Sequence, residues 1–277
     1  MSGGGDHDHD RAEVGVVIAT RDRREVLLST LTRLRALPES PPIVVVDNAS
    51  RDGTAAAVAE RFPAVELLSL DRNRGAAARN FGAELLATPY VAFSDDDSWW
   101  NAGSLRRAAE LFDRFPSLGL LAARILVGPE RRLDPTSAQM RAAPAPGLPG
   151  PRVVGFVACG ALVRRSAFLG AGGFCERFGI GGEERLLTID MGTAGWDLCY
   201  AGELVAVHAP DGGARPGRPW RERRNDLWTS WLRMPAGEAL TDTWRLAREG
   251  FGDRTAWEAL LAALPGLPWA LRRRRAV

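Results

Sequence analysis

The chain has 277 residues, and its 36 basic side chains nearly balance its 34 acidic ones, for a net charge of +2. A hydrophobic share of 45% and a charged share of 25% are average for a globular protein, which argues against a mostly disordered or collagen-like chain. Near-neutrality argues against a general nucleic-acid binder, because such proteins present a dominant basic face.

The two ends and the cysteines narrow the class further. Residues 1–12 are polar and acidic, so they predict a disordered tail rather than a secretion signal. The three cysteines are widely spaced and form no CxxC pair, which favours neither a zinc knuckle nor a disulfide framework. We therefore expect a reducing, intracellular setting, with the cysteines packed as small apolar groups. The longest apolar stretch is too short and too broken by proline to span a bilayer.

Between residues 13 and 127, short apolar runs alternate with amphipathic stretches. The runs predict buried strands at 14–20, 43–47, 65–70, 90–94 and 118–127. Apolar residues at helical spacing predict helices at 24–37, 54–61, 76–86 and 105–115. This alternation predicts a mostly parallel sheet with helices on both faces. Ligands bind such sheets outside the carboxyl ends of the strands, so the polar residues there are the candidates for a site.

The composition and the hydrophobic pattern of the sequence change after residue 127. Residues 134–152 are rich in proline, alanine and glycine and predict a mobile loop over the site. Strand-like sequence resumes at 153–165, a glycine-rich run follows, and 183–194 predicts a short helix. Two short strands are expected around Gly202. We interpret 13–127 and 128–210 as two halves of one domain, followed by a helical extension over 211–277.

Three adjacent carboxylates, Asp95, Asp96 and Asp97, stand at the end of the apolar run 90–94. Their mutual repulsion is costly unless a cation or solvent offsets it. Oxygen ligands of this kind suit Mg²⁺ or Mn²⁺, so the triplet predicts a metal site. The alternative is an acidic loop that caps the next helix.

Other strand ends also carry polar residues. Asp47 ends the second strand, where its carboxylate can accept hydrogen bonds from a base or a ribose. Asp52, followed by a glycine and a threonine, is on its own better explained as a turn and helix cap. Arg79 and Asn80 share one turn of an alanine-rich helix and are placed to point at a nucleotide. The alternative is a tightly packed helix with exposed arginines.

Taken together, these segments resemble a known family. Thr20-Arg21 after the first strand, VVDNASRDGT, NRGAAARNFG and the strand-terminal DDD occur in the order and at the spacing typical of family 2 glycosyltransferases. The resemblance covers about residues 14–208 and is strongest over the first 90 residues of that span. It implies a GT-A type α/β domain with a Rossmann-like sheet, a nucleotide-diphosphate sugar donor, a divalent metal (Mn²⁺ or Mg²⁺) and an inverting reaction.

The resemblance also assigns roles to single residues. It implies that Thr20, Arg21 and Asp47 hold the nucleoside. Asp52 and Arg79 would fix the nucleoside or the diphosphate, and Asp95 and Asp96 would face the ribose or the sugar. Asp97 would be the direct metal ligand, and Cys159 would lie in a wall of the acceptor site. His208, the last of three histidines, stands where relatives contact the diphosphate or metal; a structural histidine is the alternative.

The family also has an acidic base motif, often Glu-Asp, before a short helix. Glu183 and Glu184 occupy that place here. Two neighbouring carboxylates suit a general base, because one can hold the other partly protonated. Glu184 stands where the family usually has aspartate, so the choice between the two stays open, with Asp190 as a weaker candidate. The alternative is a pair of exposed glutamates favoured by the helix dipole.

The last third of the chain, residues 211–277, holds 13 arginines against eight acidic residues and several tryptophans. One helical face combines Leu227, Trp228, Trp231 and Leu232. Such a face suits an anionic membrane surface, or packing against the domain or a second subunit in a homodimer. We favour packing, because the segments lack a long uninterrupted apolar face.

These observations predict a metal-assisted inverting glycosyltransferase. The donor would be a UDP-, dTDP- or GDP-sugar bound by 13–127, and the acceptor a saccharide or lipid-linked hydroxyl bound by 128–210. The product would be a cell-surface polysaccharide, a glycolipid or a glycosylated secondary metabolite, made in the cytoplasm or peripherally at the inner face of the plasma membrane. A nucleotidyltransferase is disfavoured because the loop after the first strand lacks glycine. A non-catalytic sugar-nucleotide-binding or membrane-surface scaffold is the third possibility.

Overall fold

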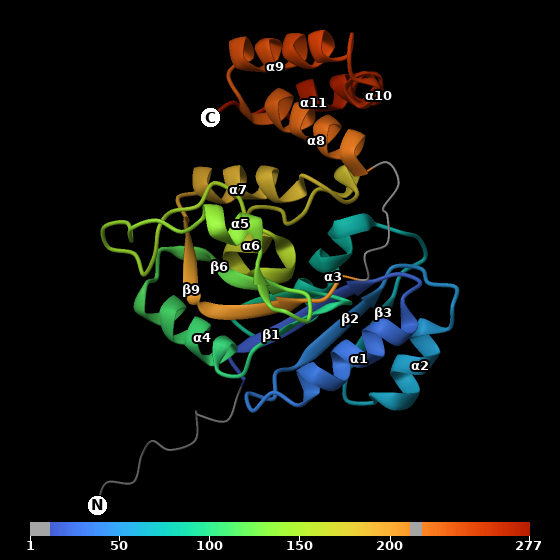
Figure 1. Cartoon of the computed structure of the whole chain (residues 1–277), viewed down its shortest axis with the longest axis vertical. Helices are drawn as coiled ribbons and strands as arrows, with labels where there is room; N and C mark the ends of the chain where they lie inside the picture. Colours follow the sequence, from blue (N-terminus) through green and yellow to red (C-terminus); the bar gives the residue numbers. More distant parts are fainter. Residues whose placement is uncertain (1–11, 211–217) are drawn as a thin grey trace, which may run out of the picture.

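The structure is a computed structural model that describes residues 12–210 and 218–277. The expected tail at 1–12 therefore lies outside the described residues except for its last position, as do residues 211–217 of the extension. Figure 1 shows an α/β body with a separate layer of C-terminal helices above it.

One half of the sheet is parallel, as the sequence predicts. Its strands are β1 (Val14–Thr20), β2 (Ile43–Asp47), β3 (Glu66–Ser69) and β4 (Tyr90–Asp95). β1 pairs with both β2 and β4, and β3 pairs with β2. The residues of β2 are all buried, because helices cover both faces of a sheet of this kind.

The other half continues the same sheet. β8 (Ala161–Arg164) runs antiparallel between β4 and β6 (Leu118–Val127), and β9 (Asp197–His208) runs parallel to β6. β5 (Ser98–Trp100) is antiparallel at the edge beside β9, and the short β7 (Arg132–Leu133) pairs with β6. The resulting order is β3-β2-β1-β4-β8-β6-β9-β5. The expected mostly parallel α/β sheet is confirmed.

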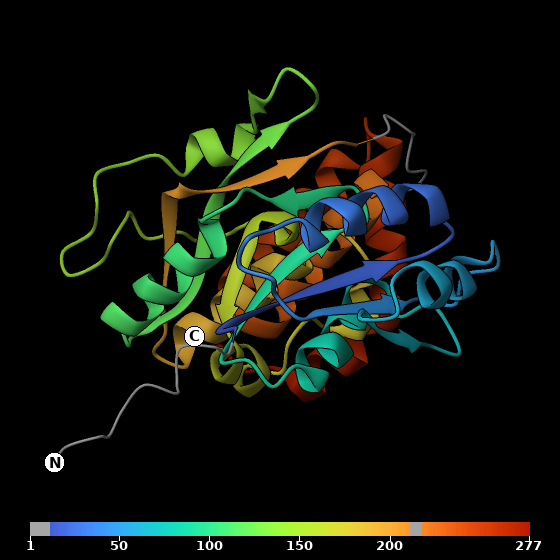
Figure 2. The same cartoon turned by 90° about the horizontal axis from the view of Figure 1, so that it is seen from below.

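Helices cover the two faces of the sheet and create two apolar cores (Figure 2). One core joins the sheet to α1 (Arg24–Arg35), α2 (Thr54–Arg61) and α4 (Ser104–Arg114). The other joins it to α3 (Ala78–Leu85), α6 (Arg165–Gly170) and α7 (Glu183–Thr193). Four short segments complete the body: η1 (Gly75–Ala77), α5 (Pro135–Gln139), η2 (Ala158–Gly160) and η3 (Glu176–Phe178).

Three local expectations differ from the structure. The stretch 134–152 contains a helical turn, α5, because the Asp134 carboxylate accepts hydrogen bonds from the backbone N–H groups of Thr136 and Ser137. Only the end of 153–165 forms a strand. The two strands expected around Gly202 are one strand, β9, because a register shift opposite β6 absorbs the extra residues without ending the pairing.

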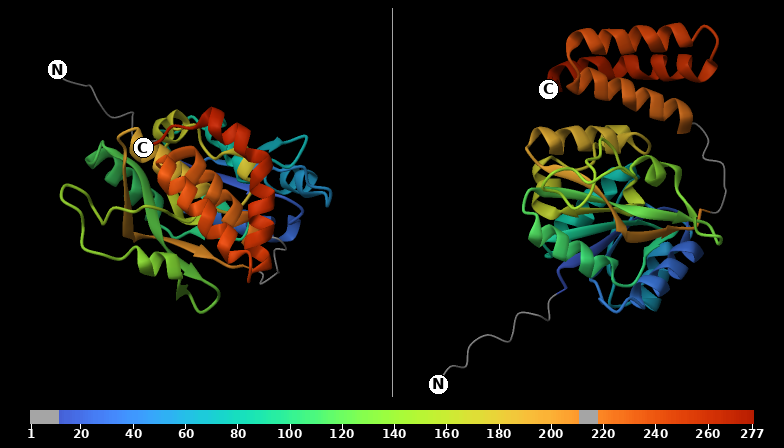
Figure 3. Two further views of the ribbon diagram at one scale, coloured as in Figure 1. Left: turned by 90° about the horizontal axis from the view of Figure 1, so that it is seen from above. Right: turned by 60° about the vertical axis from the view of Figure 1, so that its left-hand side comes forward.

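The extension forms a third layer with a core of its own (Figure 3). It consists of α8 (Arg218–Arg233), α9 (Ala236–Glu249), α10 (Arg254–Ala263), η4 (Leu264–Gly266) and α11 (Leu267–Arg273). The predicted apolar face of α8 is buried in this core together with Phe178 and Leu186 of the body, so α8 packs on the domain. Among the described residues, no helix is both long and apolar enough to cross a membrane.

Candidate active site

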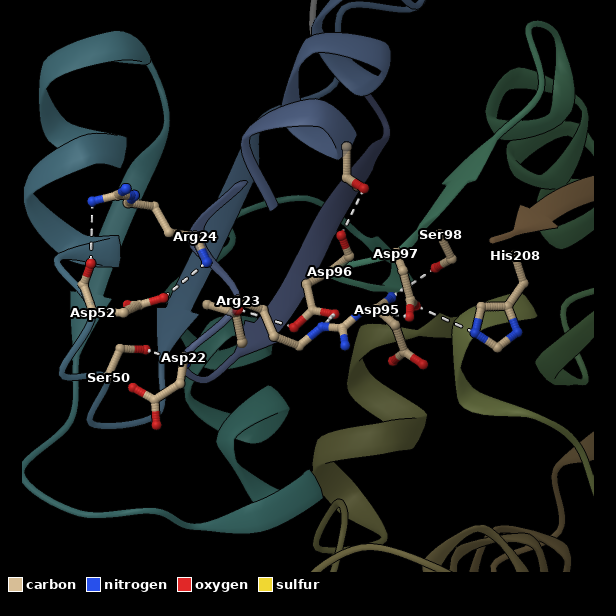
Figure 4. Close-up of polar contacts among 12 residues, drawn as sticks. Asp22, Arg23, Arg24, Ser50, Asp52, Asp95, Asp96, Asp97, Ser98 and His208 are labelled. Carbon is tan, nitrogen blue, oxygen red and sulfur yellow. Dashed lines mark hydrogen bonds and ion pairs between the residues drawn. The ribbon is translucent and has the colours of Figure 1, made fainter. Parts of the chain in front are cut away.

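Several predicted site residues meet at the carboxyl ends of β1, β2 and β4, which are neighbouring parallel strands. Thr20 ends β1 opposite Asp47, the last residue of β2. Asp95 ends β4 opposite Ala19 of β1. The three side chains come from strands that are adjacent in space although 75 residues separate the first from the last, and Asp96 and Asp97 follow directly (Figure 4).

Arg23, which sequence reasoning missed, binds two members of the acidic triplet. Its Nε donates to Asp96 Oδ1 at 2.7 Å, and its Nη2 donates to Asp97 Oδ2 at 2.9 Å. Thr20 Oγ1 donates to the other oxygen of Asp96 at 3.0 Å. Thr30 on α1 fixes the backbone by donating to the carbonyl oxygen of Asp96 at 2.7 Å. The loop between β1 and α1 thus supplies a cation for the triplet.

The electrostatics of Asp96 show how crowded the charges are. Burial raises the pKa of this carboxyl to about 6, against the opposing effect of the Arg23 charge. The neighbouring charges of Asp97 and Asp95 contribute to this rise in pKa. Burial and the two acidic neighbours together outweigh the effect of Arg23, and a further positive charge beside the triplet would lower this pKa.

The residues present fit a divalent cation. The Asp97 side chain is buried, and no group among residues 12–210 and 218–277 donates a hydrogen bond to its Oδ1. His208 Nε2, at the end of β9, lies 3.2 Å from that oxygen (Figure 4). A second set of potential ligand atoms, from Asp95, Cys159 and His208, lies within 4.8 Å of one another. Carboxylate oxygens and imidazole are common ligands of divalent transition metals, and the structure brings the predicted pair Asp97 and His208 together.

Arg79 links the triplet to the glutamate pair. The guanidinium is buried on α3 and forms an ion pair with Asp95. Burial acts to lower the pKa of Arg79, but the charges of Asp95, Glu183 and Glu184 raise it. That this arginine faces a nucleotide stays a prediction, and its position between two acidic clusters is a result of the fold.

Glu183 and Glu184 begin α7 and differ in environment. Glu183 is only 3% exposed, and its Oε2 accepts a hydrogen bond from the backbone N–H of Gly181 at 2.5 Å. Glu184 is partly exposed, and burial together with the charge of Glu183 raises its pKa to about 8. Burial also raises the pKa of Glu183. Of the two, Glu184 combines access with a carboxyl that titrates near neutrality.

A close contact between two glycines holds the loop before Glu183 and Glu184 near the carboxyl ends of the strands. Gly75 has a positive φ of 60°, and a Cβ there would lie 2.6 Å from the backbone of Gly179. The Ala76 N–H donates to the Gly179 carbonyl oxygen at 2.8 Å. A side chain at Gly75 would push the two loops apart, so this glycine allows the loop that precedes α7 to lie against η1.

The extension supports the same loop from the other side, through a second residue that sequence reasoning missed. The Asn225 side chain on α8 is buried and donates to the carbonyl oxygens of Phe178 at 2.9 Å and Gly181 at 2.5 Å. The rings of Phe178 and Trp228 lie 5.8 Å apart. An asparagine within an arginine-rich helix gave no signal in the sequence, because its partners are more than 40 residues away.

Other predicted residues stand at the rim of the site or are occupied by local contacts. Arg21 is exposed and pairs with Asp22 at 3.4 Å. Asp47 Oδ1 accepts from the Ser50 N–H at 3.0 Å. The Asp52 carboxylate accepts from the backbone N–H groups of Arg24 and Thr54, both at 3.0 Å, and so fixes the starts of α1 and α2. Asp190, the weaker base candidate, forms an ion pair with Arg233 on α8.

Residues 15–170 match the family model described as glycosyl transferase family 2. The match covers more than half of the chain. The chain belongs to glycosyl transferase family 2. The resemblance of the strand-end motifs to this family is thereby confirmed, and the protein is a glycosyltransferase.

A curated relative is the N-acetylglucosaminyl-diphospho-decaprenol L-rhamnosyltransferase of Mycobacterium tuberculosis. It is 27% identical over 231 residues, which cover 70% of this chain and 74% of the relative. Similar solved structures include S. aureus TarS 1-349 in complex with UDP-GlcNAc, with a TM-score of 0.63 and 17% identity. The match covers 79% of this chain and 65% of that one, while the chain spans only 40% of a longer TarS structure.

A second solved structure is the mannosyltransferase PcManGT from Pyrobaculum calidifontis in complex with GDP-Man and Mn²⁺. Its TM-score is 0.57 at 22% identity, and the match covers 94% of this chain and 72% of that one. At these identities the structural likeness concerns the fold, and it confirms the expected GT-A type.

Proposed function

We propose that this family 2 glycosyltransferase moves a sugar, with inversion, from a nucleotide-diphosphate sugar to an acceptor hydroxyl, assisted by Mn²⁺ or Mg²⁺. The observation that carries the proposal is the pairing of two largely buried acidic clusters near the carboxyl ends of β1, β2 and β4. One cluster can bind a metal cation and consists of Asp95 to Asp97 with His208. The other can accept a proton as a general base and consists of Glu183 and Glu184. Mn²⁺ in the complex of the P. calidifontis relative supports a metal.

The donor would lie over the ends of β1, β2 and β4, with its diphosphate toward the triplet. Thr20, Asp47 and the adjoining loops would hold the nucleoside, and Asp97 and His208 would hold the cation. A cation there supplies positive charge that stabilises the leaving diphosphate. A pocket lined by Asp22, Arg23, Arg24 and Asp52 adjoins the triplet through Arg23 and offers space for part of the nucleotide.

The acceptor hydroxyl would lose its proton to Glu184. The acceptor oxygen would then attack the anomeric carbon on the face opposite the diphosphate. The bond between the anomeric carbon and the diphosphate oxygen would break, and the diphosphate would leave with the electron pair. A pKa of about 8 lies close to neutrality, where a general base works best. Glu183 is the poorer choice because one of its oxygens already accepts the Gly181 N–H.

We also propose a lipid-linked acceptor and peripheral contact with the inner face of the plasma membrane. The M. tuberculosis relative is named for a decaprenol-linked substrate. In this chain, Leu240 and Trp244 lie one turn apart on α9 and are each 71% exposed, and Phe251 after α9 is 91% exposed. The exposed Arg245 and Arg248 lie on the same helix, a combination that suits an anionic lipid surface.

Two experiments test these proposals. Incubation with a panel of nucleotide sugars, with and without Mn²⁺, should release nucleoside diphosphate in a reaction that EDTA stops. Release of pyrophosphate from a nucleoside triphosphate would instead support a nucleotidyltransferase.

The second experiment tests the membrane contact. The fraction of protein that sediments with phosphatidylglycerol vesicles should fall when Leu240 and Trp244 are replaced by serine. Equal sedimentation of the variant would contradict the membrane contact.

A further inference from the structure

Cys159 is part of an apolar core and also lies beside the acidic triplet. It lies in η2 (Ala158–Gly160), which contacts both β4, the strand of Asp95, and β9, the strand of His208. Its side chain is 1% exposed. The other two cysteines lie elsewhere: Cys199 is buried within β9, and Cys175 precedes η3. Of the three thiols, the structure places Cys159 with the acidic triplet.

The geometry around this thiol is that of a ligand set. Cys159 Sγ, a carboxylate oxygen of Asp95 and a ring nitrogen of His208 all lie within 4.8 Å of one another. Metal–ligand bonds of about 2.0–2.3 Å hold donors on one ion at comparable or slightly shorter separations, so ordinary side-chain rotation can bring the three together. Independently, the buried Asp97 Oδ1 accepts no hydrogen bond from the described residues and points at the same histidine.

We propose that Cys159 supplies a sulfur ligand to the cation of this site and thereby selects a transition metal ion over Mg²⁺. The inference rests on the proposed function only in that the same ion would serve the diphosphate. Thiolate sulfur favours softer ions, whereas Mg²⁺ prefers oxygen ligands. On coordination the thiol loses its proton to the buffer, and the thiolate forms the bond to the metal.

Cobalt provides a direct readout, because a thiolate bound to Co²⁺ gives a sulfur-to-metal charge-transfer band in the near ultraviolet. The full-length chain is titrated with Co²⁺ in a background with His7→Ala and His9→Ala, which removes the histidines of the N-terminal segment. We expect the band in this parent protein and in the Cys199→Ala control. It should be absent in Cys159→Ser, with Co²⁺ affinity at least about tenfold lower, the size of effect seen when partners of metal ligands are removed.

Several results would overturn the inference. These are a parent protein that binds Co²⁺ without the band or does not bind it, a Cys159→Ser variant that keeps the band, and Mg²⁺ displacing Co²⁺ at equal concentration. Circular dichroism and thermal unfolding check that the variant is folded, and a parent protein without the band overturns the inference whether or not the variant folds. Neither readout needs a sugar donor, so a chain with the band but no transfer would contradict the proposed function while leaving the sulfur ligand in place.

Discussion

The acidic triplet after β4 and the glutamate pair at the start of α7 are both dense, largely buried groups of carboxylates, but they are compensated differently. Within the triplet, Arg23 binds Asp96 and Asp97, and Arg79 pairs with Asp95. Glu183 instead accepts a backbone N–H, and the Arg79 charge acts on both glutamates without a hydrogen bond to either. Arginine side chains stabilise the carboxylates of the triplet. The glutamate pair is stabilised instead by protonation of its carboxyl groups.

The pKa values show the consequence of this difference. Asp96, with an arginine at hydrogen-bonding distance, has its pKa raised to about 6, whereas that of Glu184 is raised to about 8. Clustering of carboxylates therefore does not by itself distinguish a metal site from a general base. The positive charge within hydrogen-bonding distance makes the distinction, and the following substitutions test it.

The largest effect is expected at the cation cluster. Asp97→Asn removes one negative charge from the metal ligands, and we expect kcat to fall by about 10³, as when a preorganised electrostatic group is lost. Isothermal titration should show weaker Mn²⁺ binding. Asp71→Asn, at an exposed aspartate that pairs with Arg74, is the control. Unchanged Mn²⁺ affinity in Asp97→Asn would break the assignment of the triplet to a metal.

At the proton cluster, Glu184→Gln should lower kcat by about 10² to 10⁴ while leaving the KM for the donor unchanged, because a general base acts on the acceptor. Steady-state kinetics with the donor varied measure both. Glu238→Gln, on the exposed first turn of α9, is the matched control. If Glu183→Gln lost more kcat than Glu184→Gln, the roles of the two glutamates would be reversed.

The raised pKa of Glu184 predicts that both the stability and the transfer rate depend on pH. Between pH 4.5, the ordinary pKa of glutamate, and about 8, folded Glu184 keeps a proton that the unfolded chain releases. The free energy of unfolding should therefore decrease as the pH rises through this window, and less steeply in Glu184→Gln. The transfer rate should rise over the same range as the base loses its proton. Urea unfolding at several pH values measures the first effect, and identical slopes for both proteins would refute it.

The smallest effect is expected for Arg23→Gln. Without metal this substitution leaves Asp96 and Asp97 without their arginine, and we expect a loss of about 1–3 kcal/mol of stability, typical for buried hydrogen bonds to charged groups. Saturating Mn²⁺ should restore part of it, because a cation replaces the lost charge. Arg24→Gln removes an exposed pair with Glu25 and an exposed hydrogen bond to the Asp52 carbonyl oxygen, and it should change stability by less than about 1 kcal/mol. A loss that Mn²⁺ does not reduce would separate Arg23 from the cation site.

Local pattern was sufficient for much of the fold. The strands β1, β2 and β6 occur where their apolar runs predict them, and Asp95 to Asp97 end a strand as expected. These features depend on hydrophobic periodicity and on residues close in sequence, which a single chain reveals directly. The order of motifs was sufficient for the family, which the model match over residues 15–170 confirms.

The partners of the site residues were decided by tertiary structure. Arg23 meets Asp96 and Asp97 across more than 70 residues, Asn225 meets Gly181 across 44, and Cys159 approaches Asp95 and His208 only through the packing of η2 between strands. The sequence by itself determined the elements, the family and the carboxylates, because these are properties of neighbouring residues. Charge compensation and burial, which separate a cation site from a proton site, arise only when distant segments meet, and no local pattern encodes them.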